Sequence, residues 1–147
     1  MLRRLMLFFF ALSLAGSLLT ACGSTSAATP KHDLKMAPMS MMPADVKSAA
    51  TNTQQAYQFA AANPDVTQHI PCYCGCGNLG HTSNYMCYVK SVEADGTVNF
   101  DSHALGCSIC VDITQDAMRL FKQGKTATEI KAYVDKTYSR FGPSNMQ

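Results

Sequence analysis

The sequence predicts an α+β fold that is mainly helical and carries one small β-hairpin. Apolar residues recur at helical spacing through the last third of the chain. An Asp95-Gly96 pair separates two short β-prone runs, and cysteines crowd the segment before them. Such patterns indicate a helix pair, a tight hairpin and an irregular loop. We therefore expect the order N-terminal helix, Cys-rich loop, β-hairpin, C-terminal helical hairpin.

The first helix and the hairpin are predicted from composition and turn chemistry. Residues 44–63 are rich in Ala and Gln, follow a proline and contain no Gly or Pro, which favours one helix ending before Pro64. Residues 85–92 favour a strand, and residues 97–100 can form the return strand. Gly96 can adopt the positive φ of the turn between them without a steric cost.

The C-terminal helices have the clearest signals. Gly124 stands where a C-cap is expected, and Thr126-Ala127-Thr128-Glu129 has the pattern of a capping box. Because so few residues separate the two helices, we expect an antiparallel helical hairpin. The apolar positions at helical spacing before Gly124 are Ile113, Ala117, Leu120 and Phe121.

The N-terminus has the pattern of a secretory signal. A basic start at residues 1–4 is followed by an apolar run from Leu5 to Leu19. The sequence Leu19-Thr20-Ala21-Cys22 resembles the lipobox of bacterial lipoproteins. That resemblance implies a signal peptide at residues 1–21, a lipid on Cys22, and an extracytoplasmic protein of the bacterial cell envelope anchored to the membrane. The alternative is an ordinary cleavage site beside an unrelated cysteine.

Two segments follow the predicted lipid anchor. Residues 22–43 are rich in Ser, Thr, Ala, Pro and Met and predict a flexible tether, whereas residues 44–147 predict a single Cys-rich domain. Residues 36–42 hold four of the nine methionines, and thioethers favour Cu(I), so copper capture by the tether is one open interpretation. Without the two arginines of the signal the net charge is near zero, which argues against nucleic-acid binding.

One run of three cysteines is the most informative feature for the chemistry of the candidate site. It reads Pro71-Cys72-Tyr73-Cys74-Gly75-Cys76-Gly77. Cysteines two residues apart on an extended backbone are poorly placed for a disulfide, but they can share one soft metal ion. Without Cys22 the cysteine count is even, which is also compatible with disulfides outside the cytoplasm. The six cysteines of the domain are Cys72, Cys74, Cys76, Cys87, Cys107 and Cys110.

Cys107-Ser108-Ile109-Cys110 stands at the expected start of a helix, whose dipole favours thiolates for either metal binding or redox exchange. His81 and His103 are spaced as candidate imidazole ligands beside the cysteines, and His69 is a weaker candidate. If one site unites these residues, a sulfur of residues 72–76 should lie within about 8 Å of Cys107 or Cys110, a little beyond the reach of one disulfide.

The seven-residue run, with His81, Cys87 and the later Cys107–Cys110 pair, resembles the PCYCGC-motif lipoproteins of bacteria. The resemblance covers roughly residues 57–138. It implies a lipoprotein whose six cysteines belong to one site or framework, and it brings no established biochemical role. The C-terminal half also resembles, locally, the CxxC helical hairpin of the thiol-reducing subunit in cytochrome c maturation, which implies disulfide exchange.

Three functions remain open from the sequence. The first is binding of copper or zinc by the six cysteines with His81 and His103, and the others are thiol–disulfide exchange through Cys107 and Cys110 or a disulfide-stapled structural module. A redox or metal-transfer protein is the expected partner. No Ser/His/Asp arrangement, paired-carboxylate site or Gly-rich phosphate loop stands out, which argues against a hydrolase or a nucleotide enzyme.

Overall fold

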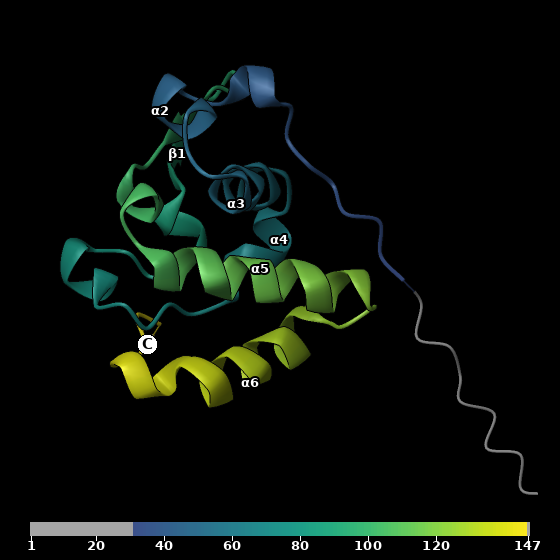
Figure 1. The fold of residues 1–147 in the computed structure, drawn as a ribbon, viewed down its shortest axis with the longest axis vertical. Helices are drawn as coiled ribbons and strands as arrows, with labels where there is room; N and C mark the ends of the chain where they lie inside the picture. Colours follow the sequence, from purple (N-terminus) through teal and green to yellow (C-terminus); the bar gives the residue numbers. More distant parts are fainter. Residues whose placement is uncertain (1–30, 147) are drawn as a thin grey trace, which may run out of the picture.

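A computed structural model describes residues 31–146 and shows a mainly helical α+β fold (Figure 1). Within these residues the chain forms three helices, a cysteine-rich loop, an antiparallel hairpin and two further helices. The predicted fold class and order of elements are thereby confirmed. The helices are α2 (Ala44–Lys47), α3 (Thr51–Ala62), α4 (Pro64–Thr67), α5 (Ser108–Lys122) and α6 (Ala127–Tyr138), and the strands are β1 (Val89–Val92) and β2 (Val98–Phe100).

The core lies where α3, α5 and α6 pack together. α5 contacts α3 on one side and α6 on the other (Figure 1). The apolar stripe predicted for α5 faces this core, and its Ile113 and Ala117 are fully buried, as are Ile130 and Val134 of α6. Burial of an aliphatic side chain of this size contributes about 1.5–3 kcal/mol. The helical hairpin is therefore held by apolar stripes that the sequence already displays.

The predicted ends of these helices are also observed. Gly124 adopts a left-handed φ of 86°, and the Lys125 N–H donates to the Leu120 carbonyl at 3.1 Å. In α6 the Glu129 N–H donates to Thr126 Oγ1 at 3.2 Å, and the Thr126 N–H donates back to the Glu129 carboxylate at 2.9 Å. This reciprocal capping box fixes the point at which the second helix begins.

The helix predicted over residues 44–63 is divided into α2 and α3. Ser48 Oγ donates to the Ala44 carbonyl at 3.0 Å, a side-chain bond that competes with helix continuation. After the break, the Gln54 side-chain amide donates to the carbonyls of Lys47 and Ala49 at 2.9 and 2.8 Å. Two backbone carbonyls that lose their helical partners at the break therefore still accept hydrogen bonds. This lowers the free-energy cost of interrupting the helix.

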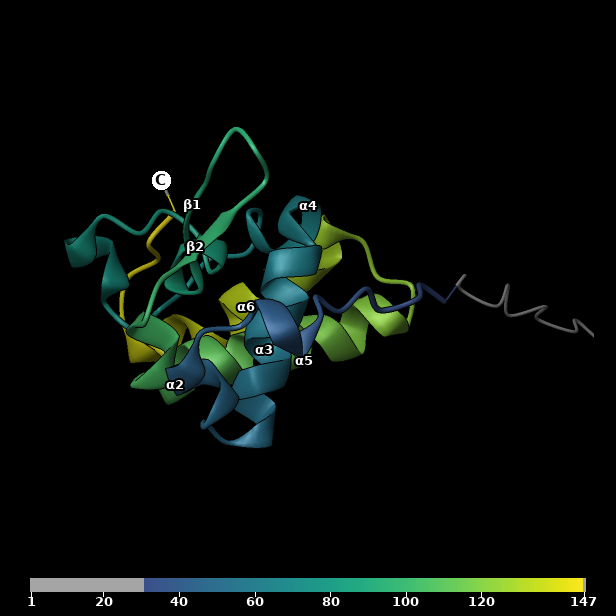
Figure 2. The same cartoon turned by 90° about the horizontal axis from the view of Figure 1, so that it is seen from above.

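The predicted hairpin is present and is shorter than expected on its first strand. Gly96 takes a φ of 87° in the turn, and Val92 pairs with Val98, with an irregularity between Val89 and Ser91. Residues Tyr85–Cys87 form a 3₁₀ turn instead of extending the strand, and this turn buries Cys87. The turn between the strands projects away from the helices (Figure 2).

Residues 31–43, the second half of the predicted tether, run along the helical body. Ala37 and Met42 are buried, and Ala37 exchanges hydrogen bonds with Gln58 of α3, through its N–H at 3.0 Å and its carbonyl at 2.7 Å. Met36 and Met39 pack against the core, whereas Met41 is exposed. These thioethers are therefore largely engaged in packing.

The predicted signal peptide and Cys22 lie outside the described residues. Among residues 31–146, no helix is both long and apolar enough to cross a membrane.

Candidate metal centre

All six cysteines of the folded domain gather in one place, and none of them forms a disulfide. Three come from the loop between α4 and β1, one from the 3₁₀ turn before β1 and two from the start of α5. Cys72 Sγ lies 3.3 Å from Cys110 Sγ, far inside the predicted limit of about 8 Å. The expectation that the motif and the later CxxC pair form one site is confirmed.

The loop reaches this geometry through left-handed glycines. Gly75, with a φ of 85°, turns the chain between Cys74 and Cys76, and Gly80, with a φ of 87°, ends the 3₁₀ turn Cys76–Leu79. A residue with a Cβ is strained at such angles, so glycine is favoured at both positions. Earlier in the same run, the Cys72 and Cys74 sulfurs approach to 3.4 Å.

The sulfur separations match those of thiolates around a metal. Cys110 Sγ lies 3.3 Å from Cys87 Sγ and 3.5 Å from Cys74 Sγ, and Cys76 Sγ lies 3.7 Å from Cys87 Sγ. A disulfide is about 2.05 Å long. Four thiolates held about 2.3 Å from a zinc ion in a tetrahedron would lie roughly 3.8 Å apart. The observed sulfur–sulfur distances are therefore close to those of thiolates around a zinc ion and far longer than a disulfide bond.

Four overlapping groups of side chains could each hold a metal ion, with all ligand atoms of a group within 4.8 Å of one another. Together they use all six cysteines and two histidines, which are the eight residues that the sequence predicts as ligands. The groups are Cys74, His103, Cys107 and Cys110; Cys76, His81, Cys87 and His103; Cys72, Cys74 and Cys76; and Cys72, Cys87 and Cys110.

The two histidines of the cluster differ in their contacts. His103 Nε2 lies 3.4 Å from Cys74 Sγ, and its ring packs edge-on to that of His81 with 5.2 Å between centroids. His81 is buried, and its Nδ1 has no hydrogen-bond partner in the described chain. Buried polar atoms almost always have a partner. His81, whose ring belongs to a group with Cys76 and Cys87, therefore has a free imidazole nitrogen available to bind a metal ion.

Asp101 contacts both histidines, His103 through its backbone and His81 through its ring. One carboxylate oxygen accepts the backbone N–H of His103 at 2.8 Å, and the other lies 3.7 Å from His81 Nε2. Tyr57 Oη donates to the Asp101 carbonyl at 2.7 Å and so ties this residue to α3. A carboxylate facing the far nitrogen of an imidazole is a common support for a metal-binding histidine.

Asn145, near the C-terminus, clamps the cysteine run and was not predicted. Its Oδ1 accepts the Cys72 N–H at 2.6 Å, its Nδ2 donates to Cys76 Sγ at 3.5 Å, and its own N–H donates to the Cys72 carbonyl at 3.0 Å. A Cβ at Gly142 would lie 3.0 Å from the Tyr73 carbonyl oxygen, so the tail and the motif pass very close together. The sequence signals a turn at Gly142-Pro143 and contains nothing that pairs Asn145 with Cys72.

A buried polar network supports Cys110 from within the core. Its carbonyl accepts hydrogen bonds from Tyr88 Oη at 2.8 Å, Thr114 Oγ1 at 3.0 Å and Asn84 Nδ2 at 3.3 Å. Burial raises the pKa of the Tyr88 hydroxyl well above its usual value, so that group stays a neutral donor. These hydrogen bonds fix the position of the first turn of α5, which carries Cys110, relative to the core.

The contacts among the thiols lower the pKa of some of them and raise the pKa of others. Contact with Cys110 lowers the pKa of Cys72 and that of Cys76, while contacts with Cys72 and Cys76 raise the pKa of Cys110. Burial, followed by the charge of Cys72, raises the pKa of Cys74. Several thiolates in contact are favourable only when a cation compensates their charge.

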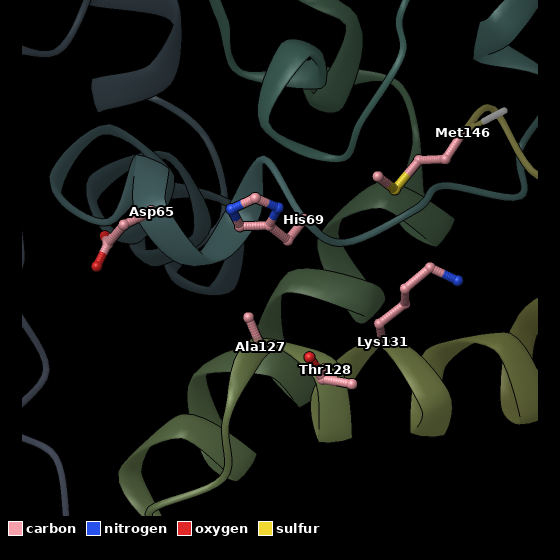
Figure 3. A pocket seen from close by; sticks show the side chains of 6 residues that line it. All are labelled: Asp65, His69, Ala127, Thr128, Lys131 and Met146. Carbon is pink, nitrogen blue, oxygen red and sulfur yellow. The ribbon is translucent and has the colours of Figure 1, made fainter.

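His69, the weaker sequence candidate, lies elsewhere. It lines a cavity of about 490 Å³ on the surface together with residues of α4, α6 and the C-terminal tail (Figure 3). None of the six residues that line this cavity belongs to the cysteine cluster.

The comparisons with known proteins agree with the motif. No curated protein and no solved structure matches the chain. A family model described as "Protein of unknown function with PCYCGC motif" matches residues 10–144, a wider span than the resemblance seen in the sequence. The chain therefore belongs to this PCYCGC-motif family.

Proposed function

We propose that this protein binds a thiophilic metal ion, Cu(I) or Zn(II), through the cysteine–histidine cluster, on the extracytoplasmic side of a bacterial membrane. The observation that carries the proposal is the convergence of six unpaired cysteine sulfurs from three separate parts of the chain. Five of the sulfurs make contacts of 3.3–3.7 Å, and that of Cys107 lies within 4.8 Å of those of Cys74 and Cys110. Sulfur donors with two imidazoles suit both ions, since both accept thiolate and imidazole ligands.

The support around the cluster favours a resident metal. The Asp101 carboxylate lies beside the His81 ring and accepts the backbone N–H of His103, and the Asn145 amide donates to Cys76. Outer residues of this kind are needed in metal sites because they fix the geometry and the charge of the ligands. Cys74 and Cys107 are partly exposed, which would allow exchange of the ion with a metal-transfer partner.

Elemental analysis tests this proposal. The full chain, purified under reducing conditions and desalted after incubation with Zn(II) or Cu(I), should retain metal, and the Cys110→Ser variant should retain less. His69→Ala is the matched control and should load normally, because His69 lies outside the cluster. Wild-type protein that retains neither metal while its thiols are reduced would contradict the proposal.

The location is the second part of the proposal. The apolar run before Leu19-Thr20-Ala21-Cys22 supports a lipid anchor at Cys22. Intact mass of protein extracted from membranes should show a lipid adduct and loss of residues 1–21. A mature protein that begins after residue 21 and carries no lipid adduct would contradict the anchor.

Thiol–disulfide exchange remains a second candidate, favoured by one observation. Cys107 is partly exposed at the start of α5, and its sulfur lies within 4.8 Å of that of Cys110. Such a pair could attack a disulfide of a partner protein, with Cys107 as the accessible thiol. Cys110→Ser should then trap mixed disulfides with partners, whereas a metal-binding protein should yield none.

A further inference from the structure

The cluster contains more ligands than one metal ion can use. Six sulfurs and two imidazoles converge, whereas a zinc ion in a protein takes about four ligands and Cu(I) takes no more. We infer that the centre holds at least two metal ions joined by cysteine thiolates. This inference rests on the proposed function and adds the number of ions and the way they are linked.

The ligands divide into two sets. Cys74, Cys107 and Cys110 form one group with His103, and Cys76, Cys87 and His81 form another with the same histidine. The two groups share only His103, so each has three ligands of its own. Each set of three, completed by a further donor, can hold one ion.

Cys72 links the two sets. Its sulfur lies 3.4 Å from Cys74 and 3.3 Å from Cys110, which belong to the first set, and within 4.8 Å of Cys76 and Cys87, which belong to the second. Its side chain is fully buried at the centre of the cluster. A thiolate has enough lone pairs to bind two ions, so Cys72 is placed to bridge them.

Direct contact between the sets supports the same arrangement. Cys110 of the first set and Cys87 of the second lie with their sulfurs 3.3 Å apart. Ions bound to the two sets would therefore be neighbours that share sulfur ligands, and not two independent sites.

Charge also favours more than one ion. In the described part of the chain, the Lys and Arg ion pairs are with Asp116, Glu129 and Asp135, and no Lys or Arg side chain hydrogen-bonds to a cluster sulfur. If all six thiols ionise, one divalent ion would leave four negative charges uncompensated in a cluster in which four of the six cysteines are buried, which is costly. Two divalent ions offset four of the six negative charges.

Titration of the reduced, metal-free full chain with Cd(II) tests the inference. Cadmium is a thiophilic probe whose ¹¹³Cd nucleus reports its ligands and couples through a shared sulfur. We expect native mass spectra to reach at least two cadmium ions per chain, and NMR to show signals coupled to one another. Saturation at one ion would overturn the inference while leaving the proposed function intact, and no binding at all would overturn both.

Two variants assign the sets. Cys107→Ser should lose or weaken one ion and His81→Ala the other, each leaving a ¹¹³Cd signal from the set that was not changed. The matched control His69→Ala should bind as many ions as the wild type. If both variants perturb the same signal, the division into two sets is wrong. The wild-type titration alone decides the number of ions. Misfolding of a variant would therefore leave the test of the inference unaffected.

Discussion

The α5–α6 hairpin and the cysteine-rich loop are built in opposite ways. The hairpin is held by buried apolar residues at helical spacing, such as Ile113 and Ile130, and by a capping box between neighbouring residues. The loop has little regular structure, and its contacts join residues far apart in the chain, as when Asn145 binds Cys72. The difference shows that the helices are specified by local sequence and stabilised by packing of their apolar faces, whereas the loop needs polar partners from distant parts of the chain and, in our proposal, a metal.

Metal removal should produce the largest difference in stability between the cysteine-rich loop and the helical hairpin. If free metal stands at about 1,000 times its dissociation constant, binding stabilises the folded protein by about 4 kcal/mol. After chelation of the metal-loaded protein, amide hydrogen exchange should accelerate more in residues 71–87 than in α6. Restoring metal should reverse the change. Equal acceleration in both regions would show that they are not stabilised in different ways.

Truncation of the helical core should have the reverse pattern. Ile130 is fully buried, and Ile130→Ala should lower the free energy of unfolding by about 2–5 kcal/mol through lost burial and a cavity. Chemical denaturation measures this change. The number of bound metal ions, measured well below the melting temperature, should stay at the wild-type value. A change in that number would mean that the core and the cluster are one coupled unit.

Loss of the tail clamp should weaken the loop selectively. Asn145→Ala removes the acceptor for the Cys72 N–H and the donor to Cys76 Sγ, and loss of such outer support typically lowers metal affinity about 10–100-fold. Competition with a chromophoric chelator measures the affinity. Asn99→Ala is the matched control, because Asn99 is an exposed amide that bonds only within the β-hairpin. Equal affinities of the two variants would contradict a role for the clamp.

Loss of the helix cap should have the smallest effect. Thr126→Ala removes the side-chain acceptor for the Glu129 N–H and should cost about 1 kcal/mol of stability. Thermal unfolding measures it, and metal affinity should be unchanged. A Thr128→Ala variant, one residue inside the helix, provides the comparison and should cost less. An equal cost in the two variants would argue against the capping box.

The hairpin of helices was predictable because its signals are local. The apolar positions of α5, the turn at Gly124 and the capping box at Thr126 all lie within a few residues of the structure they specify. The break between α2 and α3 was not predicted, because Gln54 satisfies the carbonyls of Lys47 and Ala49 only once the chain has already turned.

The sequence allowed the residues of the candidate site to be predicted. It did not allow the polar contacts that support them to be predicted. Cysteine and histidine types identified all eight residues of the cluster, and the order of elements indicated that a sulfur of residues 72–76 would lie near Cys107 or Cys110. The supports were not visible. Asn145 is an ordinary polar residue whose role depends on a contact with Cys72 far along the chain, and nothing in the sequence pairs Asp101 with the His81 ring. No periodicity or spacing connects residues that lie more than seventy positions apart.

The most direct test of the metal centre is the intact mass of the protein purified without oxygen, recorded under native and then denaturing conditions with thiol alkylation. We predict a native mass that exceeds the denatured mass by that of the bound metal, and six alkylated cysteines in residues 72–110 after denaturation. A metal-free native mass together with cysteines that resist alkylation, because they are paired as disulfides, would contradict the account.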